Sequence, residues 1–422
     1  MARGVSILIK NGLLVTQDQS RRVLEGNLYV EGDKIVEVAG PDRSADSVID
    51  ASGCLVLPGL VNGYTRVAHT LLGPPKDLSP ESAHRKMEAL RERLTRRDVQ
   101  MAAALAAAQM LQSGTTSFLD LFTWEDEVSR AVAHVGMRGF LAWDVGEAAE
   151  DLDACEQYLS RFKSRERIVP LVGTGNLSQA EAVRDLARKY GTRWCVPLSE
   201  TRTAVYRFQR ETGARPVEWL AKGQLLSADL IALHCIWLTL NEIRSLSRAE
   251  VKVIHCPASN QMTGAGGPMP LQEMLHEGLA VGIGTDSPFL CGTLDPFHHM
   301  RLCGSLHKGN RWDAAAVPAQ LILDLFTVRS SECLGLDGGS LEEGRVADVV
   351  VLDPQRRISL PTGPEEIISY LVYVAEGAQV RHVVVSGAHV VEDAALRTVD
   401  IEVLREDVGR MRAELGHEDS WR

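Results

Sequence analysis

The chain has 422 residues, 45% of them hydrophobic, and its 45 basic and 56 acidic residues give a formal net charge of −11. This length exceeds a usual single domain and accommodates one large α/β barrel of about 250 to 300 residues with a smaller domain beside it. The negative balance argues against nucleic acid or an anionic membrane as a partner.

No stretch of the sequence has the features of an export signal, and no apolar run reaches the roughly 18 residues needed to cross a bilayer. We therefore expect a cytoplasmic protein. The eight cysteines are scattered, and none forms a CxxC pair. This spacing predicts reduced thiols, most of them buried.

Short β-rich runs lie near both ends of the chain, at residues 5–15, 26–38, 346–353 and 378–391. Between them, helical and strand-like segments alternate, which is typical of a βα barrel. Counted from Leu60, the sequence predicts eight barrel strands, the later ones at 115–121, 138–145, 168–175, 193–201, 230–238, 251–260 and 279–287. Helices are predicted at 95–113, 126–135, 319–336 and 401–415.

Residues 58–72, PGLVNGYTRVAHTLL, form the most informative stretch. A hydrophobic run ends at Pro58-Gly59, and polar side chains then occupy alternate positions at Asn62, Tyr64 and Arg66. Because side chains two apart in a strand point the same way, this pattern predicts a buried parallel strand that ends at the mouth of a barrel.

This stretch, together with SGTTSFLD (113–120), GTDS (284–287) and GSLEEGRVAD (339–348), resembles the amidohydrolase superfamily. The similarity is to the branch with guanine, cytosine and S-adenosylhomocysteine deaminases and triazine chlorohydrolases. It implies a distorted (β/α)8 TIM barrel at 58–344 and a small β-sandwich formed by 1–57 and 345–422. It also implies a homo-oligomer, a dimer or larger, that acts on a small-molecule substrate.

The positions that bind metal in this family are altered. The family pattern PG-[LF]-[VI]-N-x-H-x-H has two histidines that hold zinc or iron, and this chain has Tyr64 and Arg66 in their places. Where the family has His-x-x-Glu in the fifth strand, this chain has Pro197 and Glu200. Zinc needs about three or four N, O or S donors, and Asp286 alone remains among these positions. We therefore predict no metal here, and an ion pair between the permanent cation Arg66 and Asp286.

Polar residues that end different barrel strands converge at one face of such a fold, so they are the candidate active-site residues. We predict Glu200 and His234 as an acid/base pair, with Asp286 positioning water or holding Arg66. The predicted substrate-binding residues are Tyr64, Arg66, Asn176, His255 and Asn260. An equally plausible role for His255 and Asn260 is only to fix the loop after the seventh strand.

Other donors leave an alternative open, because Cys195, His234 and Asp286 could form a rebuilt zinc or iron site. His69 lies just beyond Arg66 in the sequence, so its side chain is also a candidate to reach the mouth of the barrel. His298, His299 and His307 are expected on the surface of a helix. A histidine that contacts substrate in many relatives is absent from VGTGNLS (172–178), so this segment does not indicate which substrate the chain binds.

Three functions follow from these residues. The first is an amidohydrolase-type enzyme without a metal or other cofactor that acts on a small polar nitrogen-containing substrate. The family resemblance favours C–N bond hydrolysis, whereas the residues themselves are also compatible with elimination or isomerisation. The second is a catalytically inactive relative that serves as a binding or partner subunit. The third is a zinc or iron deaminase with the rebuilt site.

Overall fold

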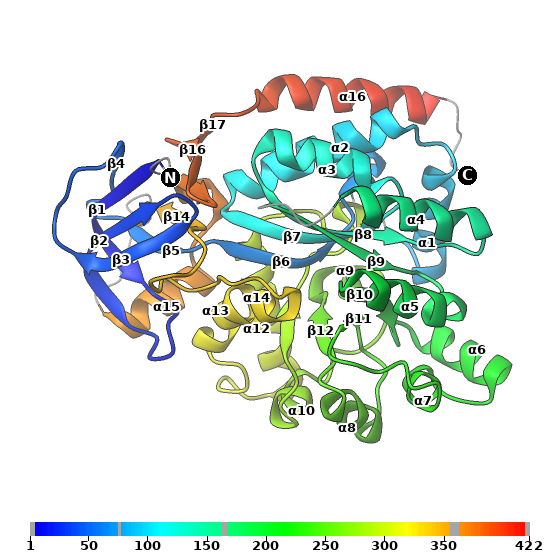
Figure 1. The fold of residues 1–422 in the computed structure, drawn as a ribbon. Coiled ribbons are helices and arrows are strands. Elements are labelled where there is room, and N and C mark those ends of the chain that lie inside the picture. Colours follow the sequence, from blue (N-terminus) through cyan, green and yellow to red (C-terminus); the bar gives the residue numbers. More distant parts are fainter. Residues whose placement is uncertain (1–4, 75–76, 163–166, 355–362, 418–422) are drawn as a thin grey trace.

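The computed structural model describes residues 5–74, 77–162, 167–354 and 363–417. Within these ranges, a parallel eight-stranded sheet runs in chain order from the first strand to the last and curls into a barrel (Figure 1). The predicted barrel is confirmed. Its strands are β6 (Leu60–Thr65), β7 (Thr115–Phe122), β8 (Arg138–Asp144), β9 (Ile168–Gly173), β10 (Trp194–Leu198), β11 (Leu230–His234), β12 (Lys252–His255) and β13 (Val281–Ile283).

The barrel closes where β6 meets the segment after β13. The carbonyl of Tyr64 accepts hydrogen bonds of 2.9 Å from the N–H groups of both Thr285 and Asp286. The Asn62 side chain also hydrogen-bonds to Thr285, through its amide at 2.9 Å and its carbonyl at 3.0 Å. A side chain at Gly284 would have its Cβ only 2.7 Å from the Tyr64 backbone, so the seam needs glycine there. Asn62 therefore serves the closure of the barrel.

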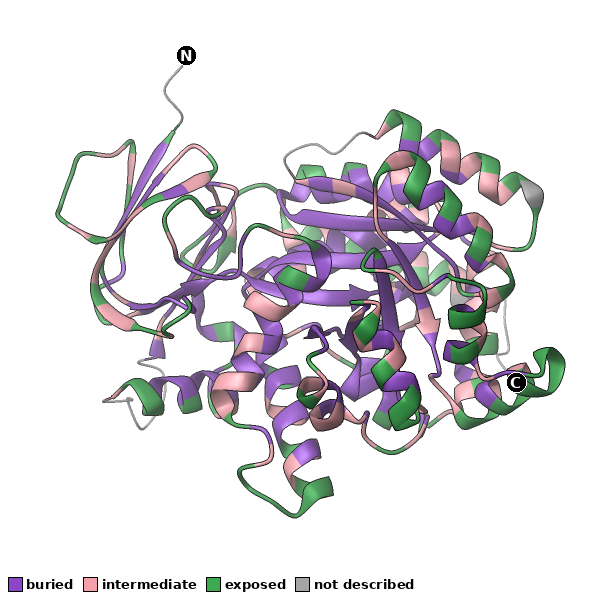
Figure 2. Cartoon of the chain, turned by 60° about the horizontal axis from the view of Figure 1, so that its bottom comes forward, coloured by how far each residue is buried: buried purple, intermediate pink, exposed green. Residues whose placement is uncertain are grey.

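The strands are buried on both faces, and Figure 2 shows them as the buried centre of the molecule with mixed helices around them. Leu119 and Leu121 of β7 pack inside the barrel, whereas Phe118 and Phe122 pack against the surrounding helices. This alternation follows from the two-residue period of a strand. It explains why the barrel strands are nearly continuous hydrophobic runs.

Helices surround the barrel. The helix predicted at 95–113 is α2, where Thr95 and Asp98 form a capping box and the alanines are buried. Three of the described helices lie between β6 and β7, namely η1 (Val67–Leu72), α1 (Pro80–Arg91) and α2 (Arg96–Gln112). The described α-helices after β7 are α3 (Glu125–Val135), α4 (Ala149–Arg161), α5 (Ala180–Tyr190), α6 (Arg202–Thr212), α7 (Pro216–Lys222), α8 (Leu240–Arg248), α9 (Pro257–Met262), α10 (Leu271–His276), α11 (Pro288–Cys291), α12 (Pro296–Arg311), α13 (Ala319–Phe326), α14 (Val328–Leu334), α15 (Pro364–Tyr373) and α16 (Ile401–His417).

The single helix predicted at 319–336 is wrong, because the structure has two helices, α13 and α14. The break lies at Thr327, whose φ of −122° and ψ of −101° are not helical. The Thr327 hydroxyl donates to the carbonyl of Leu323 at 2.7 Å and accepts from the side chain of Gln17 at 3.0 Å. Tertiary contacts with the N-terminal segment thus accompany a break in a continuous hydrophobic pattern.

Both ends of the chain build one mixed nine-stranded sheet, which confirms the predicted pairing of the termini. Figure 1 shows it beside the barrel. Its central strand β5 lies parallel to β1 and antiparallel to β14. Its members are β1 (Ser6–Val15), β2 (Val23–Glu31), β3 (Lys34–Gly40), β4 (Ser47–Asp50), β5 (Leu55–Pro58), β14 (Val349–Leu352), β15 (Val380–Val385), β16 (Ala388–Glu392) and β17 (Ala395–Leu396). None of the described helices is both long and apolar enough to cross a membrane.

A buried ion pair joins the terminal sheet to the barrel. Arg138, at the start of β8, lies 3.3 Å from Asp348, and both side chains are buried. Asp348 also accepts a 2.7 Å hydrogen bond from the N–H of Ser386. Removing one partner of such a pair leaves an uncompensated buried charge.

We expect Asp348→Ala to lower the free energy of unfolding by about 3 to 5 kcal/mol, because Arg138 would lose its counter-ion. Asp337→Ala is the matched control, since Asp337 is exposed and pairs with Lys34 at 3.2 Å, and should cost about 0 to 1 kcal/mol. Denaturant unfolding measures both, and equal losses would contradict the role of the buried pair.

Candidate active site

The predicted site residues Tyr64, Arg66 and Asp286 meet at the mouth of the barrel, the face formed by the C-terminal ends of its strands. Arg66 Nε donates a 2.6 Å hydrogen bond to the hydroxyl of Tyr64 and lies 4.0 Å from Asp286 Oδ1. The side chains of Arg66 and Asp286 are only 15% and 6% exposed. The predicted ion pair is present, and it is buried, so solvent screens it weakly.

Burial opposes the charge of Arg66, but Tyr64 and the carboxylates Asp286 and Asp144 outweigh that cost and raise the pKa of its guanidinium. Burial disfavours the charged phenolate of Tyr64 and so raises the pKa of its hydroxyl well above the ordinary value. The mouth therefore holds a fixed cation and a neutral phenol.

His234 ends β11 and faces the same place. Its ring lies edge-on to that of Tyr64, with centroids 5.8 Å apart. His234 Nδ1 lies 2.9 Å from the side-chain oxygen of Asn260. Because a carbonyl oxygen only accepts, the proton of this contact lies on Nδ1, and Nε2 is the nitrogen with the lone pair when the ring is neutral. Asn260 thus sets the tautomer of His234.

Three residues at the strand ends adopt left-handed backbone conformations. Ser199, His234 and Asp286 have φ values of 51°, 69° and 58°. Residues other than glycine rarely occupy this region, and such strain concentrates at functional sites. The backbone therefore turns sharply where the candidate residues project.

Glu200 follows β10 and is half-buried. Burial raises the pKa of the Cys256 thiol, and the negative charges of Asp286 and Glu200 raise it further. Glu200 follows the C-terminal end of β10 and Asp286 follows that of β13, so both lie at the same face of the barrel.

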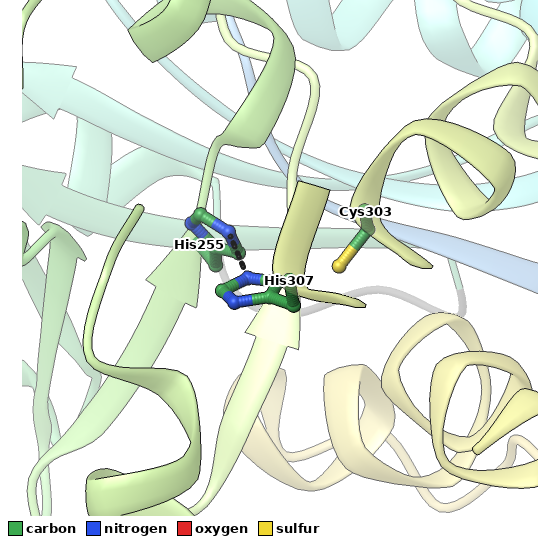
Figure 3. A group of neighbouring side chains, drawn as sticks. All are labelled: His255, Cys303 and His307. Atoms are coloured by element: carbon green, nitrogen blue, oxygen red, sulfur yellow. Dashed lines mark hydrogen bonds between the residues drawn. The ribbon is translucent and has the colours of Figure 1, made fainter. Parts of the chain in front are cut away.

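Two predicted substrate-binding residues make other contacts. Asn176 caps the short helix η2 (Leu177–Gln179) by accepting from Ser178 N–H and also donates to Glu147 at 2.7 Å. His255 Nε2 lies 3.1 Å from Nε2 of His307 on α12 (Figure 3). Their roles toward a substrate stay predictions.

The expectation for the three histidines of α12 is correct for His298 alone, which is exposed. His299 and His307 are 0% and 2% exposed, because they lie on the side of α12 that packs against the rest of the protein. His69 is also buried and contacts the hydroxyl of Ser287 at 3.0 Å, and burial holds its pKa well below the ordinary value.

A pair of buried carboxyl groups beside the site was missed by sequence reasoning. Asp120 Oδ1 accepts from the N–H of Val67 at 2.9 Å, and Glu125 accepts from the N–H of Phe122 at 3.0 Å. Burial raises the pKa of both acids, and the charge of Asp120 raises the pKa of Glu125 further. Glu125 therefore favours its protonated form, and Asp120 anchors the residue after Arg66. Asp120, the one charged residue of the buried strand β7, was the available signal.

The amidohydrolase family model matches residues 55–390, which is most of the chain. The chain belongs to the amidohydrolase family. It is 34% identical to the 5-methylthioadenosine/S-adenosylhomocysteine deaminase of Pyrococcus furiosus over 94% of this chain and 97% of that one. It is 32% identical to the 5'-deoxyadenosine deaminase of Methanosarcina barkeri over 97% and 98% of the two chains.

Solved amidohydrolase structures are similar over nearly the whole chain. An adenosine deaminase from Xanthomonas campestris with bound zinc superposes with a TM-score of 0.92 and 25% identity, over 98% of this chain and 99% of that one. The atrazine chlorohydrolase TrzN from Arthrobacter aurescens, also with zinc, gives 0.88 and 22% over 96% and 100%. At 22% identity, the similarity to the atrazine chlorohydrolase shows a shared fold alone. These names agree with the amidohydrolase-type hydrolase that the sequence indicates.

The mouth of this amidohydrolase does not fit the zinc ion of those structures. The guanidinium of Arg66 lies against Asp286, the one metal ligand that the family pattern retains there, and would repel a divalent cation. Cys195, His234 and Asp286 also fail to form a ligand cluster. Among the described residues, the only three such groups with ligand atoms within 4.8 Å of one another belong to His255, Cys303 and His307.

We expect Glu125→Gln to reduce the pH dependence of stability. In the wild type, the raised pKa values favour the protonated pair, so stability is present below the ordinary carboxyl pKa and is lost as pH rises through about 7, the pKa of Asp120. A glutamine amide can donate to Asp120 at every pH. Unfolding measured at about pH 5 and pH 8 tests this.

Glu211→Gln, on the exposed surface of α6, is the control and should keep the wild-type pH dependence. If Glu125→Gln also kept it, protonation of Glu125 would not be a source of the pH dependence of stability.

Proposed function

We propose that this amidohydrolase removes an amino group from a small polar nitrogen-containing substrate by hydrolysis, without a metal at the barrel mouth. The observation that carries the proposal is the buried cation Arg66, which lies 4.0 Å from Asp286 and is hydrogen-bonded to Tyr64. A fixed positive charge in a water-poor pocket can stabilise negative charge that develops during a reaction.

In this proposal the water oxygen forms a bond to the carbon that carries the amino group, and the C–N bond then breaks. Glu200 and His234 form the acid/base pair. One takes the proton from water and the other supplies a proton to the leaving nitrogen, so that R–NH2 and H2O become R–OH and NH3. His234 is suited to accept, because Asn260 occupies its Nδ1 and leaves Nε2 free.

Arg66 then stabilises the negative charge that the heterocycle gains as the C–O bond forms. Asp286 holds Arg66 in place and orients the water. Tyr64 and Asn260 hold Arg66 and His234 in place through their hydrogen bonds. The names of the relatives support an adenine nucleoside as the substrate, with the 6-amino group as the nitrogen that leaves.

Activity should be measured as ammonia release from 5'-methylthioadenosine, S-adenosylhomocysteine and 5'-deoxyadenosine, and then from other amino-heterocycles and N-acyl acids. We expect Glu200→Gln to lower kcat by about 10²- to 10⁴-fold through loss of proton transfer. Arg66→Ala should lower it by about 10²- to 10³-fold through loss of charge stabilisation. Arg210→Ala, exposed on α6, is the control for a lost surface cation.

Full activity in both variants would show that other residues do the chemistry. No turnover and no binding of any compound in the panel would support an inactive relative that serves as a partner subunit.

The absence of a metal at the mouth has its own test. We expect Asp286→Asn to leave the metal content of the purified protein unchanged, as measured by elemental analysis without an affinity tag or chelator. A stoichiometric metal that disappears in Asp286→Asn would instead support a zinc or iron deaminase with displaced ligands.

A further inference from the structure

A second group of ligand-type side chains lies away from the mouth, between the barrel wall and α12. On β12, Ile254 belongs to the core inside the barrel, whereas Val253 belongs to the core between the barrel and the helices. His255 lies two residues after Val253 and so projects to the same outer side. Figure 3 shows it facing Cys303 and His307 of α12.

The spacing on α12 suits chelation of one ion. Cys303 and His307 are four residues apart in a helix, so their side chains lie on one face. The same spacing places the two histidines of a helical HExxH motif on one metal. His255 approaches this face from the strand, and all three side chains are buried.

The distances are close to those of a metal site. His255 Nε2 and His307 Nε2 are 3.1 Å apart, and one ligand atom from each of the three residues lies within 4.8 Å of the others. Two nitrogens bound to tetrahedral zinc at about 2.0 to 2.1 Å are separated by roughly 3.3 Å. The two imidazole nitrogens therefore already have nearly the separation that zinc requires. The Cys303 sulfur would reach the same ion through a small side-chain rotation.

We propose that His255, Cys303 and His307 bind one zinc ion that fastens α12 to β12. Two imidazoles and one thiolate are a donor set that favours zinc over magnesium or calcium. Binding forms one Zn–S and two Zn–N bonds and releases the thiol proton to solvent, with no change of oxidation state.

The protonation of the cluster suits this ion. Burial lowers the pKa of His255 well below the ordinary value and that of His307 to about 4, so both rings are neutral and have lone pairs to give. Burial raises the pKa of the Cys303 thiol to about 12. Zinc is the partner that stabilises its thiolate in such surroundings. Arg311 and Glu273 flank His307 with opposite charges.

This inference is independent of the proposed function, because it concerns a structural role and none of its three residues takes part in the proposed reaction. It assigns to His255 the alternative role of fixing the segment after the seventh strand. The test is elemental analysis of the full-length protein, purified without a tag or chelator, for wild type, Cys303→Ser, His307→Asn and Asp286→Asn. We expect about one zinc per chain in wild type and Asp286→Asn, and almost none in the other two. His298→Asn, an exposed histidine of the same helix, should keep its zinc.

A spectroscopic measurement covers the case in which the two variants fold poorly. Wild-type protein refilled with Co²⁺ should show a near-ultraviolet charge-transfer band from a cobalt–thiolate bond, whereas Cys291→Ser should keep this band. Wild-type protein that neither contains zinc nor binds added Zn²⁺ or Co²⁺ would overturn the proposal and leave a hydrogen-bonded imidazole pair. Metal lost in Asp286→Asn but kept in Cys303→Ser would overturn both this proposal and the metal-free mouth.

Discussion

A buried guanidinium determines what the mouth of this barrel can do. Arg66 is held by a hydrogen bond to Tyr64 and by the charge of Asp286. An unpaired charge at this depth would cost several kcal/mol, so the cation and the carboxylate depend on each other. The two residues come from opposite ends of the barrel sheet, and they meet only because the Tyr64 carbonyl binds the N–H groups of Thr285 and Asp286.

This dependence explains how a familiar fold can carry an altered site. Hydrophobic strands and their register build the barrel, and the whole fold superposes on the adenosine deaminase structure with a TM-score of 0.92. The side chains at the strand ends contribute little to that core, so they can change while the backbone stays. Tyr64, Arg66 and Pro197 occupy positions where the family pattern has histidines, and the surrounding strands keep their places.

The sequence was sufficient for features that depend on local patterns. The barrel strands, the helix α2 and the pairing of the termini were predictable from periodicity, capping residues and family resemblance, and Arg66 with Asp286 followed from one substituted motif. Features set by distant contacts were not. The break at Thr327 involves Gln17, and the inward direction of His307 depends on how α12 meets β12. Glu125 accepts from the N–H of Phe122 just after a left-handed residue, Trp124, and no propensity indicates this turn.

The terminal sheet has a consequence for synthesis of the protein. Strand β5 needs β14 as one neighbour, and Pro58 pairs with Val349 across the whole length of the barrel sequence. On the ribosome, the first strands emerge long before that neighbour exists, and their hydrophobic edge stays open for most of translation. The barrel can assemble while this edge is still unpaired. The N-terminal strands are therefore most exposed to aggregation in the interval before residue 349 emerges. Cells that make this chain therefore have reason to keep that interval short or to shield the N-terminal strands with a chaperone.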